Sequence, residues 1–142
     1  MKADKALMLH LGVLAALLAA HFLAPAYHHT NIARIMVLSI YAMGYNIAFG
    51  YTGLLSLGHA LLFAAGLYGA GMGVTHLGLS AGPGLIAGTV AGGVVAAAVG
   101  MLALRTAGVA FMIVTLMFAQ AGYLAILYFG QWTRGDEGIV ID

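Results

Sequence analysis

The sequence of 142 residues contains no cysteine, only two prolines and very few charged side chains. Without cysteine the chain can form neither disulfides nor thiolate zinc sites nor iron–sulfur clusters. Its lysines, Lys2 and Lys5, precede residue 6, which excludes a phosphate-binding loop of the Gly-Lys-Ser/Thr type. A net charge of +1, with scattered basic residues, is too small for a nucleic-acid-binding surface. We therefore expect no nucleic-acid partner and no nucleotide hydrolysis by this chain.

Hydrophobic residues make up 63% of the chain and charged residues 6%, whereas soluble domains have about 45–50% and about 25%. The few charges leave three uncharged stretches, residues 6–33, 35–104 and 106–133. A membrane-spanning helix needs about 20 apolar residues, so the outer stretches can each hold one span and the central stretch can hold three. The sequence therefore predicts an all-α integral membrane protein with about five transmembrane helices.

The spans are predicted at residues 6–23, 32–49, 60–77, 84–104 and 108–129. Residues 1–29 would then hold the first span and a polar link, because Pro25 cannot continue a helix. A cleaved signal peptide is the alternative, with basic residues before an apolar core and small residues at 24–26. A cytoplasmic N-terminus is slightly favoured by the positions of the basic residues, with Lys2, Lys5 and Arg105 inside and Arg34 and Arg134 outside.

Between the second and third predicted spans, Gly50 to His59 is rich in glycine and hydrogen-bonding side chains. A broken helix at membrane depth is tolerated only where it is buried in protein or lines a wet cavity, and it points to a transport site. The alternative is that the polar side chains only bond neighbouring helices. The candidate translocation path or hinge consists of Tyr45, Asn46, Gly50, Thr52, Gly53, Ser56, Gly58, His59 and Gln120.

Small residues recur at every fourth position along the fourth predicted span. They would form a smooth ridge that lets another helix approach closely. The ridge predicts either a helix buried in a bundle or a small membrane protein that oligomerises through this face. Its residues are Gly84, Gly88, Gly92, Ala96 and Gly100.

The sequence gives little support for catalysis or metal binding. Ser56 and His59 are three residues apart, but no carboxylate between Asp4 and Asp136 could orient the imidazole of a serine protease. The six histidines suggest a haem or metal site, but none of their spacings suits ligands of one ion. We expect no enzyme activity, no cofactor and no metal.

Residues 41–60, which read YAMGYNIAFGYTGLLSLGHA, closely resemble the signature of LivM-type permeases of branched-chain amino acid ABC importers. Three further stretches resemble that family in the same order. Residues 103–108 are similar to its short basic turn, residues 111–120 to the helix that follows, and residues 133–139 to its Thr-Gly-Gly-x-x-Gly loop. Arg134 departs from the pattern, because the family usually has glycine there.

The resemblance covers residues 30–142 and implies a multi-pass permease subunit of the bacterial inner membrane, carrying branched-chain amino acids or related small amides. The implied partners are a second related permease subunit, two cytoplasmic ATPase subunits, a periplasmic substrate-binding protein and membrane lipid. Family members carry a further half that docks the ATPase, so residues 1–142 are expected to be one transmembrane domain, the N-terminal half of a longer permease. The alternative is a truncated permease that forms a small oligomeric helix-packing protein without transport activity.

Overall fold

Helices and short connections make up the whole described part of the chain, residues 2–23 and 25–140 of a computed structural model. No strand occurs in these residues, which confirms the predicted all-α class. The chain divides into two units, one ending at Gly44 and the other beginning at Tyr45. Four helical segments are long and apolar enough to cross a membrane: His28–Tyr51, His59–Leu77, Ala81–Ala103 and Val109–Tyr128.

The first unit contains α1 (Lys2–Leu23) and most of α2 (Ala26–Asn46). The described apolar part of α1, Leu7–Ala20, is shorter than a membrane span, so the first predicted span, residues 6–23, stays a prediction. The polar link expected before residue 30 is instead helical, because α2 begins directly after Pro25, whose carbonyl accepts a hydrogen bond from His28 N at 2.8 Å. Proline next to a helix start loses nothing, because its missing N–H would have no partner there.

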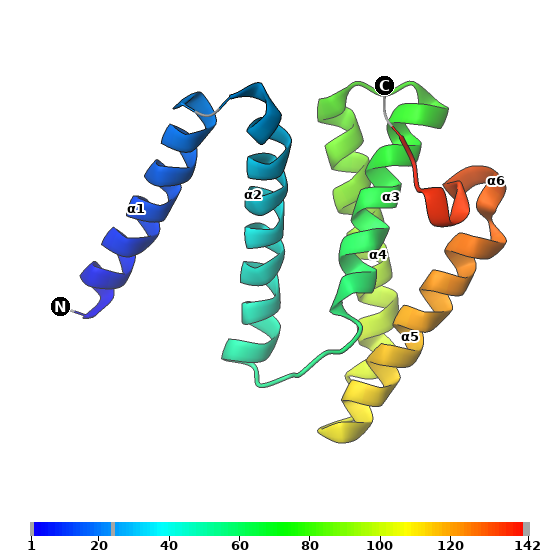
Figure 1. Ribbon diagram of the computed structural model, residues 1–142. Helices are drawn as coiled ribbons and strands as arrows, with labels where there is room; N and C mark the ends of the chain where they lie inside the picture. The colour runs from blue at the N-terminus through cyan, green and yellow to red at the C-terminus, as the bar shows by residue number, and fades with distance from the viewer. Residues whose placement is uncertain (1, 24, 141–142) are drawn as a thin grey trace. The chain divides into compact units, whose positions relative to one another are not determined.

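The second unit holds three long helices that pack side by side, α3 (His59–Leu77), α4 (Ala81–Ala103) and α5 (Val109–Tyr128) (Figure 1). Gly78 ends α3 in the left-handed conformation with φ +63°, which glycine adopts without strain. A short helix α6 (Gly130–Thr133) and a 3-10 turn η2 (Gly135–Glu137) follow α5. The predicted third, fourth and fifth spans thus correspond to α3, α4 and α5 with ends shifted by up to three residues.

Glycines bring α3 and α4 into close contact. A Cβ atom added to Gly88 would lie 2.5 Å from the Gly66 carbonyl oxygen and 2.8 Å from the Ala70 Cβ, both on α3. Added Cβ atoms on Gly84 and Gly92 would also meet α3 atoms, at 2.8 Å and 3.4 Å. Three residues of the small-residue ridge therefore face α3 of the same chain.

The remaining ridge residues, Ala96 and Gly100, are half-buried. An added Cβ on Gly100 would meet only Leu104, close to its own helix, at 3.9 Å. The part of the predicted ridge from Gly84 to Gly92 thus packs against α3 of the same chain. At Gly100 the ridge has passed beyond this close contact. Because α3 already occupies the part from Gly84 to Gly92, little of the ridge is left for a second copy.

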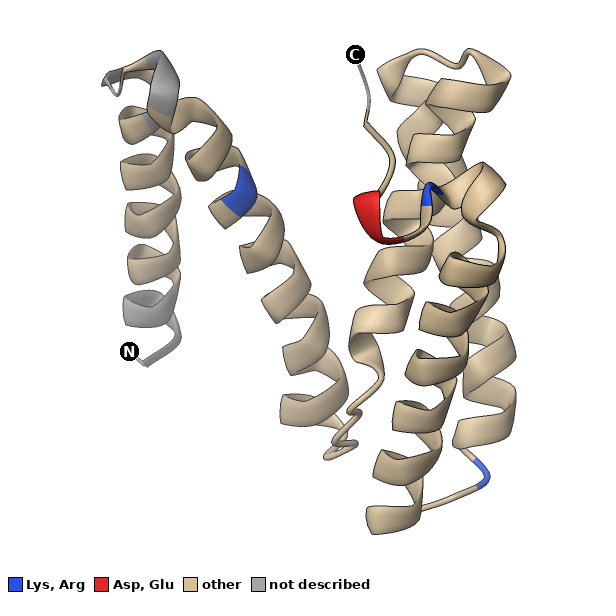
Figure 2. Cartoon of the chain, turned by 45° about the vertical axis from the view of Figure 1, so that its right-hand side comes forward, with Lys and Arg blue, Asp and Glu red and all other residues tan. Residues whose placement is uncertain are grey.

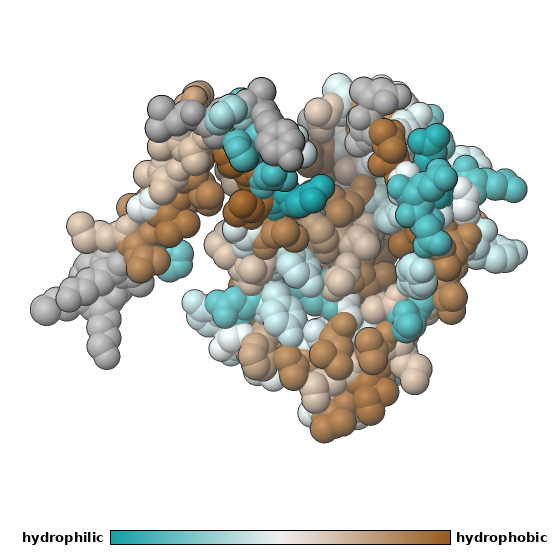
Figure 3. Space-filling view, in the orientation of Figure 1, coloured by the Kyte–Doolittle hydropathy of each residue, from teal (hydrophilic) through white to brown (hydrophobic). Residues whose placement is uncertain are grey.

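The outer faces of the three helices carry large exposed apolar side chains, including Leu85, Val94 and Met117. Figure 3 shows apolar residues over the end of the bundle where α5 begins and hydrophilic residues around α6 and η2. Such apolar surfaces on a membrane protein are covered by lipid or by other subunits.

The contact between α3 and α4 predicts opposite effects for two alanine substitutions on α4. Gly88→Ala should destabilise the protein by about 1–3 kcal/mol, because the new methyl group overlaps backbone and side-chain atoms of α3. Gly93→Ala should be neutral or stabilise by up to about 1 kcal/mol, because nothing lies within 4 Å and alanine favours a helix. Thermal unfolding in detergent, followed by circular dichroism, measures both. Equal melting temperatures for the two variants would contradict the packing.

Candidate functional site: a broken helix seated on α5

The chain between α2 and α3 is irregular, as the glycine content predicts. After α2, a π-helical turn η1 (Ile47–Tyr51) precedes non-helical residues, and α3 begins at His59. Gly53 takes the left-handed conformation with φ +71°, and its N–H donates to the Phe49 carbonyl at 3.0 Å. Leu54 N–H similarly donates to the Ala48 carbonyl at 3.0 Å. These bonds satisfy carbonyl groups that the end of the helix would otherwise leave free.

The irregular segment is held against α5 by one threonine. Leu57 N–H donates to Thr115 Oγ1 at 3.2 Å, and the Thr115 hydroxyl donates to the Met112 carbonyl at 3.0 Å. Thr115 is only 4% exposed. Gly58 is also buried, and a Cβ atom there would overlap the Thr115 carbonyl group. The break therefore depends on a glycine that admits the α5 backbone and a hydroxyl that binds the free amide.

Polar side chains flank the break on both sides. The Tyr45 and His59 rings meet edge to face with centroids 5.2 Å apart, joining the end of α2 to the start of α3. Asn46 Oδ1 lies against Gly50, where a Cβ would overlap it. These contacts bring together four of the path residues named from the sequence.

The other path residues take less central places. Thr52 is exposed and its hydroxyl bonds the Ala48 carbonyl of the same helix, while Ser56 is half-buried in the break. Gln120 is exposed on α5, and no hydrogen bond joins it to the break among the residues described. The structure therefore gathers the residues around positions 45–59 but does not bring Gln120 to them.

Thr115 was not singled out from the sequence, although it lies in the stretch that resembles the family helix. Its place in the sequence did carry a signal, because a hydroxyl inside an apolar helix needs a hydrogen-bond partner.

Beside the contact between Leu57 and Thr115, a cleft of about 200 Å³ separates the break from the start of α5. It is lined by Gly53, Leu54, Leu55, Gly108, Val109, Phe111 and Met112.

After α5 the C-terminal segment, residues 130–140, folds back on the helices. Thr133 is 7% exposed, and its hydroxyl donates to the Ile126 carbonyl at 2.6 Å and lies 3.1 Å from the Phe129 carbonyl. Tyr123 OH donates to Asp136 Oδ1 at 3.2 Å, and Ile139 packs on Gly71 of α3. In Figure 2 the acidic residues of η2 are coloured red on the cartoon.

Within the described ranges, no three His, Asp or Glu side chains come close enough to hold a metal ion. The break thus offers uncharged hydrogen-bonding groups, glycine backbone and apolar walls. Such a surface can bind or pass a small polar molecule, and it contains no arrangement for nucleophilic catalysis.

A family model described as "Branched-chain amino acid transport system / permease component" matches residues 27–141. The chain belongs to this family. The match includes the break, α3 to α5 and the C-terminal segment, so this permease component is a multi-pass membrane protein and one part of a transport system. No curated protein and no solved structure gives a match.

The role of Thr115 in holding the break of this permease component can be tested by removing its hydroxyl group. Thr115→Val should destabilise the protein by about 1 kcal/mol, because Leu57 N–H loses its partner. Amide exchange at Leu57 should also accelerate. Thr115→Ser should behave as the wild type. Thr89→Val is the matched control, since Thr89 is exposed and bonds only Leu85 of its own helix. Unchanged exchange at Leu57 in Thr115→Val would contradict this role.

The backbone at Arg134 has the conformation that glycine adopts most easily. Arg134 has φ +60° and is the only described residue other than glycine with a positive φ. A side chain in this conformation costs about 1–2 kcal/mol, so Arg134→Gly should stabilise the protein by up to about 1 kcal/mol after glycine's own entropy cost. Arg134→Ala, which removes the charge but keeps Cβ, should give no such gain. Equal melting temperatures for the glycine and alanine variants would show that the conformation carries no strain.

Proposed function

We propose that this chain is a permease subunit of an ABC importer in the bacterial inner membrane and forms part of its translocation path. Its substrates are branched-chain amino acids or related small amides. A second related permease completes the channel, two cytoplasmic ATPase subunits hydrolyse the ATP, and a periplasmic binding protein delivers the substrate. The family membership supports a transport role, and the details of substrate and partners are part of the proposal.

The observation that carries the proposal is the interrupted helix between two membrane-spanning segments. Residues 53–56 have no helical ladder, although apolar spans flank them. Lipid cannot satisfy free backbone groups, so this segment must face protein or water. The neighbouring Leu57 N–H is bonded to Thr115 of α5. The cleft of about 200 Å³ between Gly53 to Leu55 and the start of α5 leaves the irregular segment accessible to a small molecule.

The side chains at the break suit a neutral zwitterion. Tyr45, Asn46, Ser56 and His59 provide hydrogen-bond donors and acceptors without a fixed carboxylate or guanidinium, which would trap a charged substrate. Gly53, with its left-handed backbone, is a position where the chain could bend during transport. A path of this kind needs little specificity of its own if a separate protein selects the substrate.

The alternative is a small oligomeric helix-packing protein without transport activity. Its main support was the small-residue ridge, and α3 of the same chain occupies the first half of that ridge. The break would have no role in such a protein. The transport proposal accounts for both features.

Transport can be measured with the chain co-expressed with the second permease, the ATPase and the binding protein that the proposal requires. Wild-type complex in cells should take up radiolabelled leucine with ATP consumption. Asn46→Ala and His59→Ala should each lower uptake about tenfold, the effect of losing one useful hydrogen bond. Thr89→Ala, on the exposed face of α4, should leave uptake unchanged. Absence of uptake by the wild-type complex, or normal uptake by both path variants, would refute the proposal.

A further inference from the structure

A second cleft lies at the opposite end of α3 from the break. It has a volume of about 270 Å³ and forms where the C-terminal segment folds back on α3. His76 Nε2 lies 3.1 Å from the Trp132 carbonyl oxygen, and the His76 and Trp132 rings meet with centroids 5.4 Å apart. Seventeen helical residues separate His76 from His59, or about 25 Å of rise. The cleft is therefore a separate site from the break.

The lining of this cleft combines donors with apolar surface. Arg134 contributes a guanidinium with a fixed fork of donors, and Gln131 contributes an amide. The Thr75 hydroxyl donates to the Gly71 carbonyl at 2.9 Å, so its oxygen is left as an acceptor. Trp132 and Ile139 supply apolar walls. A guanidinium beside apolar walls is complementary to a carboxylate attached to a short apolar chain.

The charge of Arg134 is not neutralised within the described part of the chain. Asp136 and Glu137 follow closely in the sequence, yet neither forms an ion pair with Arg134, and Asp136 accepts a hydrogen bond from Tyr123 instead. Arg134 also occupies a left-handed position that glycine would fill without strain. Strain of this kind is typical of functional positions. The guanidinium that lines the cleft is therefore available to a carboxylate ligand.

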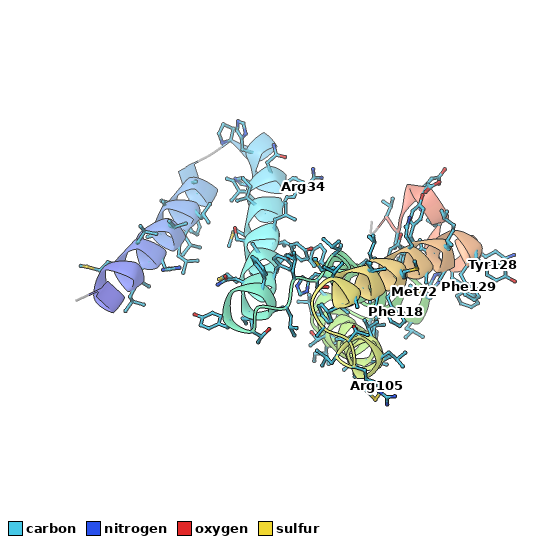
Figure 4. The ribbon with its side chains drawn as sticks, turned by 90° about the horizontal axis from the view of Figure 1, so that it is seen from below. Arg34, Met72, Arg105, Phe118, Tyr128 and Phe129 are labelled. Atoms are coloured by element: carbon cyan, nitrogen blue, oxygen red, sulfur yellow. The ribbon has the colours of Figure 1, made fainter. Side chains whose placement is uncertain are left out.

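The cleft lies beside the end of α3, next to exposed aromatic side chains. Tyr128 and Phe129 extend outward from the end of α5, as Figure 4 shows, and Trp132 is 55% exposed. Aromatic residues in such positions are typical of a membrane surface. On the orientation that the basic residues favour, this surface faces outward.

We propose that this cleft is an entry subsite that binds the carboxylate of a small apolar amino acid through Arg134. Trp132 and Ile139 contact the aliphatic side chain of the ligand, and Thr75 accepts from its ammonium group. The proposal deepens the proposed transport function and rests on it for the identity of the amino acid. It places substrate capture at one end of α3 and passage through the membrane at the other.

Trp132 is the single tryptophan of the chain, so its fluorescence reports directly on the cleft. The purified full chain in neutral detergent should show a saturable change with L-leucine and with 4-methylpentanoate, which keeps the carboxylate but lacks the amino group. Isoamylamine, which lacks the carboxylate, should give no saturable change. No saturation with leucine, an equal response to isoamylamine, or a response only to added phosphatidylglycerol would overturn the proposal.

Variants separate binding from folding. R134Q should weaken leucine binding at least about tenfold, as expected when a charged hydrogen bond is lost. R134G, which should be more stable than the wild type, should lose binding equally, so unfolding cannot explain the loss. R105Q is the matched control, because Arg105 lies in the turn between α4 and α5 (Figure 4). Wild-type affinity in R134Q and R134G would refute the role of Arg134.

The same variants distinguish this inference from the proposed function. If the wild-type complex transports leucine and R134Q leaves the KM for uptake unchanged, the subsite is wrong while the transport function stands. A raised KM with little change in maximal rate supports the subsite. If leucine binding depends on Arg134 but the wild-type complex transports nothing, the transport proposal fails and a carboxylate-binding site remains.

Discussion

A chain that interrupts a helix between two membrane spans must satisfy its freed backbone groups by contact with protein or water, because lipid offers no hydrogen bonds. Here Gly53 and Leu54 bond to the end of the preceding helix, and Leu57 bonds to α5. The Thr115 hydroxyl accepts from Leu57 N–H, and the absence of a side chain at Gly58 lets the two backbones meet. This contact fixes where α3 begins and therefore how the remaining helices can pack.

The packing of α3 against α4 also depends on residues with small side chains or none. Glycines and alanines on α3 and α4 bring the two helices close, so that dispersion contacts replace the hydrophobic effect, which is absent between helices in lipid. The opposite end of α3 contacts the C-terminal segment through Ile139 and the His76–Trp132 pair, and Thr133 bonds that segment to the end of α5. One helix thus connects the break to the second cleft.

At position 134 the backbone conformation and the proposed subsite require different residues. The left-handed backbone favours glycine, whereas the cleft gains a guanidinium only from the arginine. At the break there is no such difference, because Gly53 allows the left-handed turn and Gly58 allows the close contact with α5. A transport protein needs such locally irregular segments, and each must be stabilised by neighbouring helices.

The sequence by itself determined the all-α class, the positions of the long helices and the irregular stretch after residue 50, because hydropathy and glycine content act locally along the chain. It also indicated that Gly84, Gly88 and Gly92 share one helix face. Only the tertiary structure decided that α3 meets this face, that Thr115 holds the break from 58 residues away, and that the C-terminal segment folds back to form a cleft at Arg134. Those outcomes depend on which helices become neighbours, and that choice is made by the fit of whole surfaces.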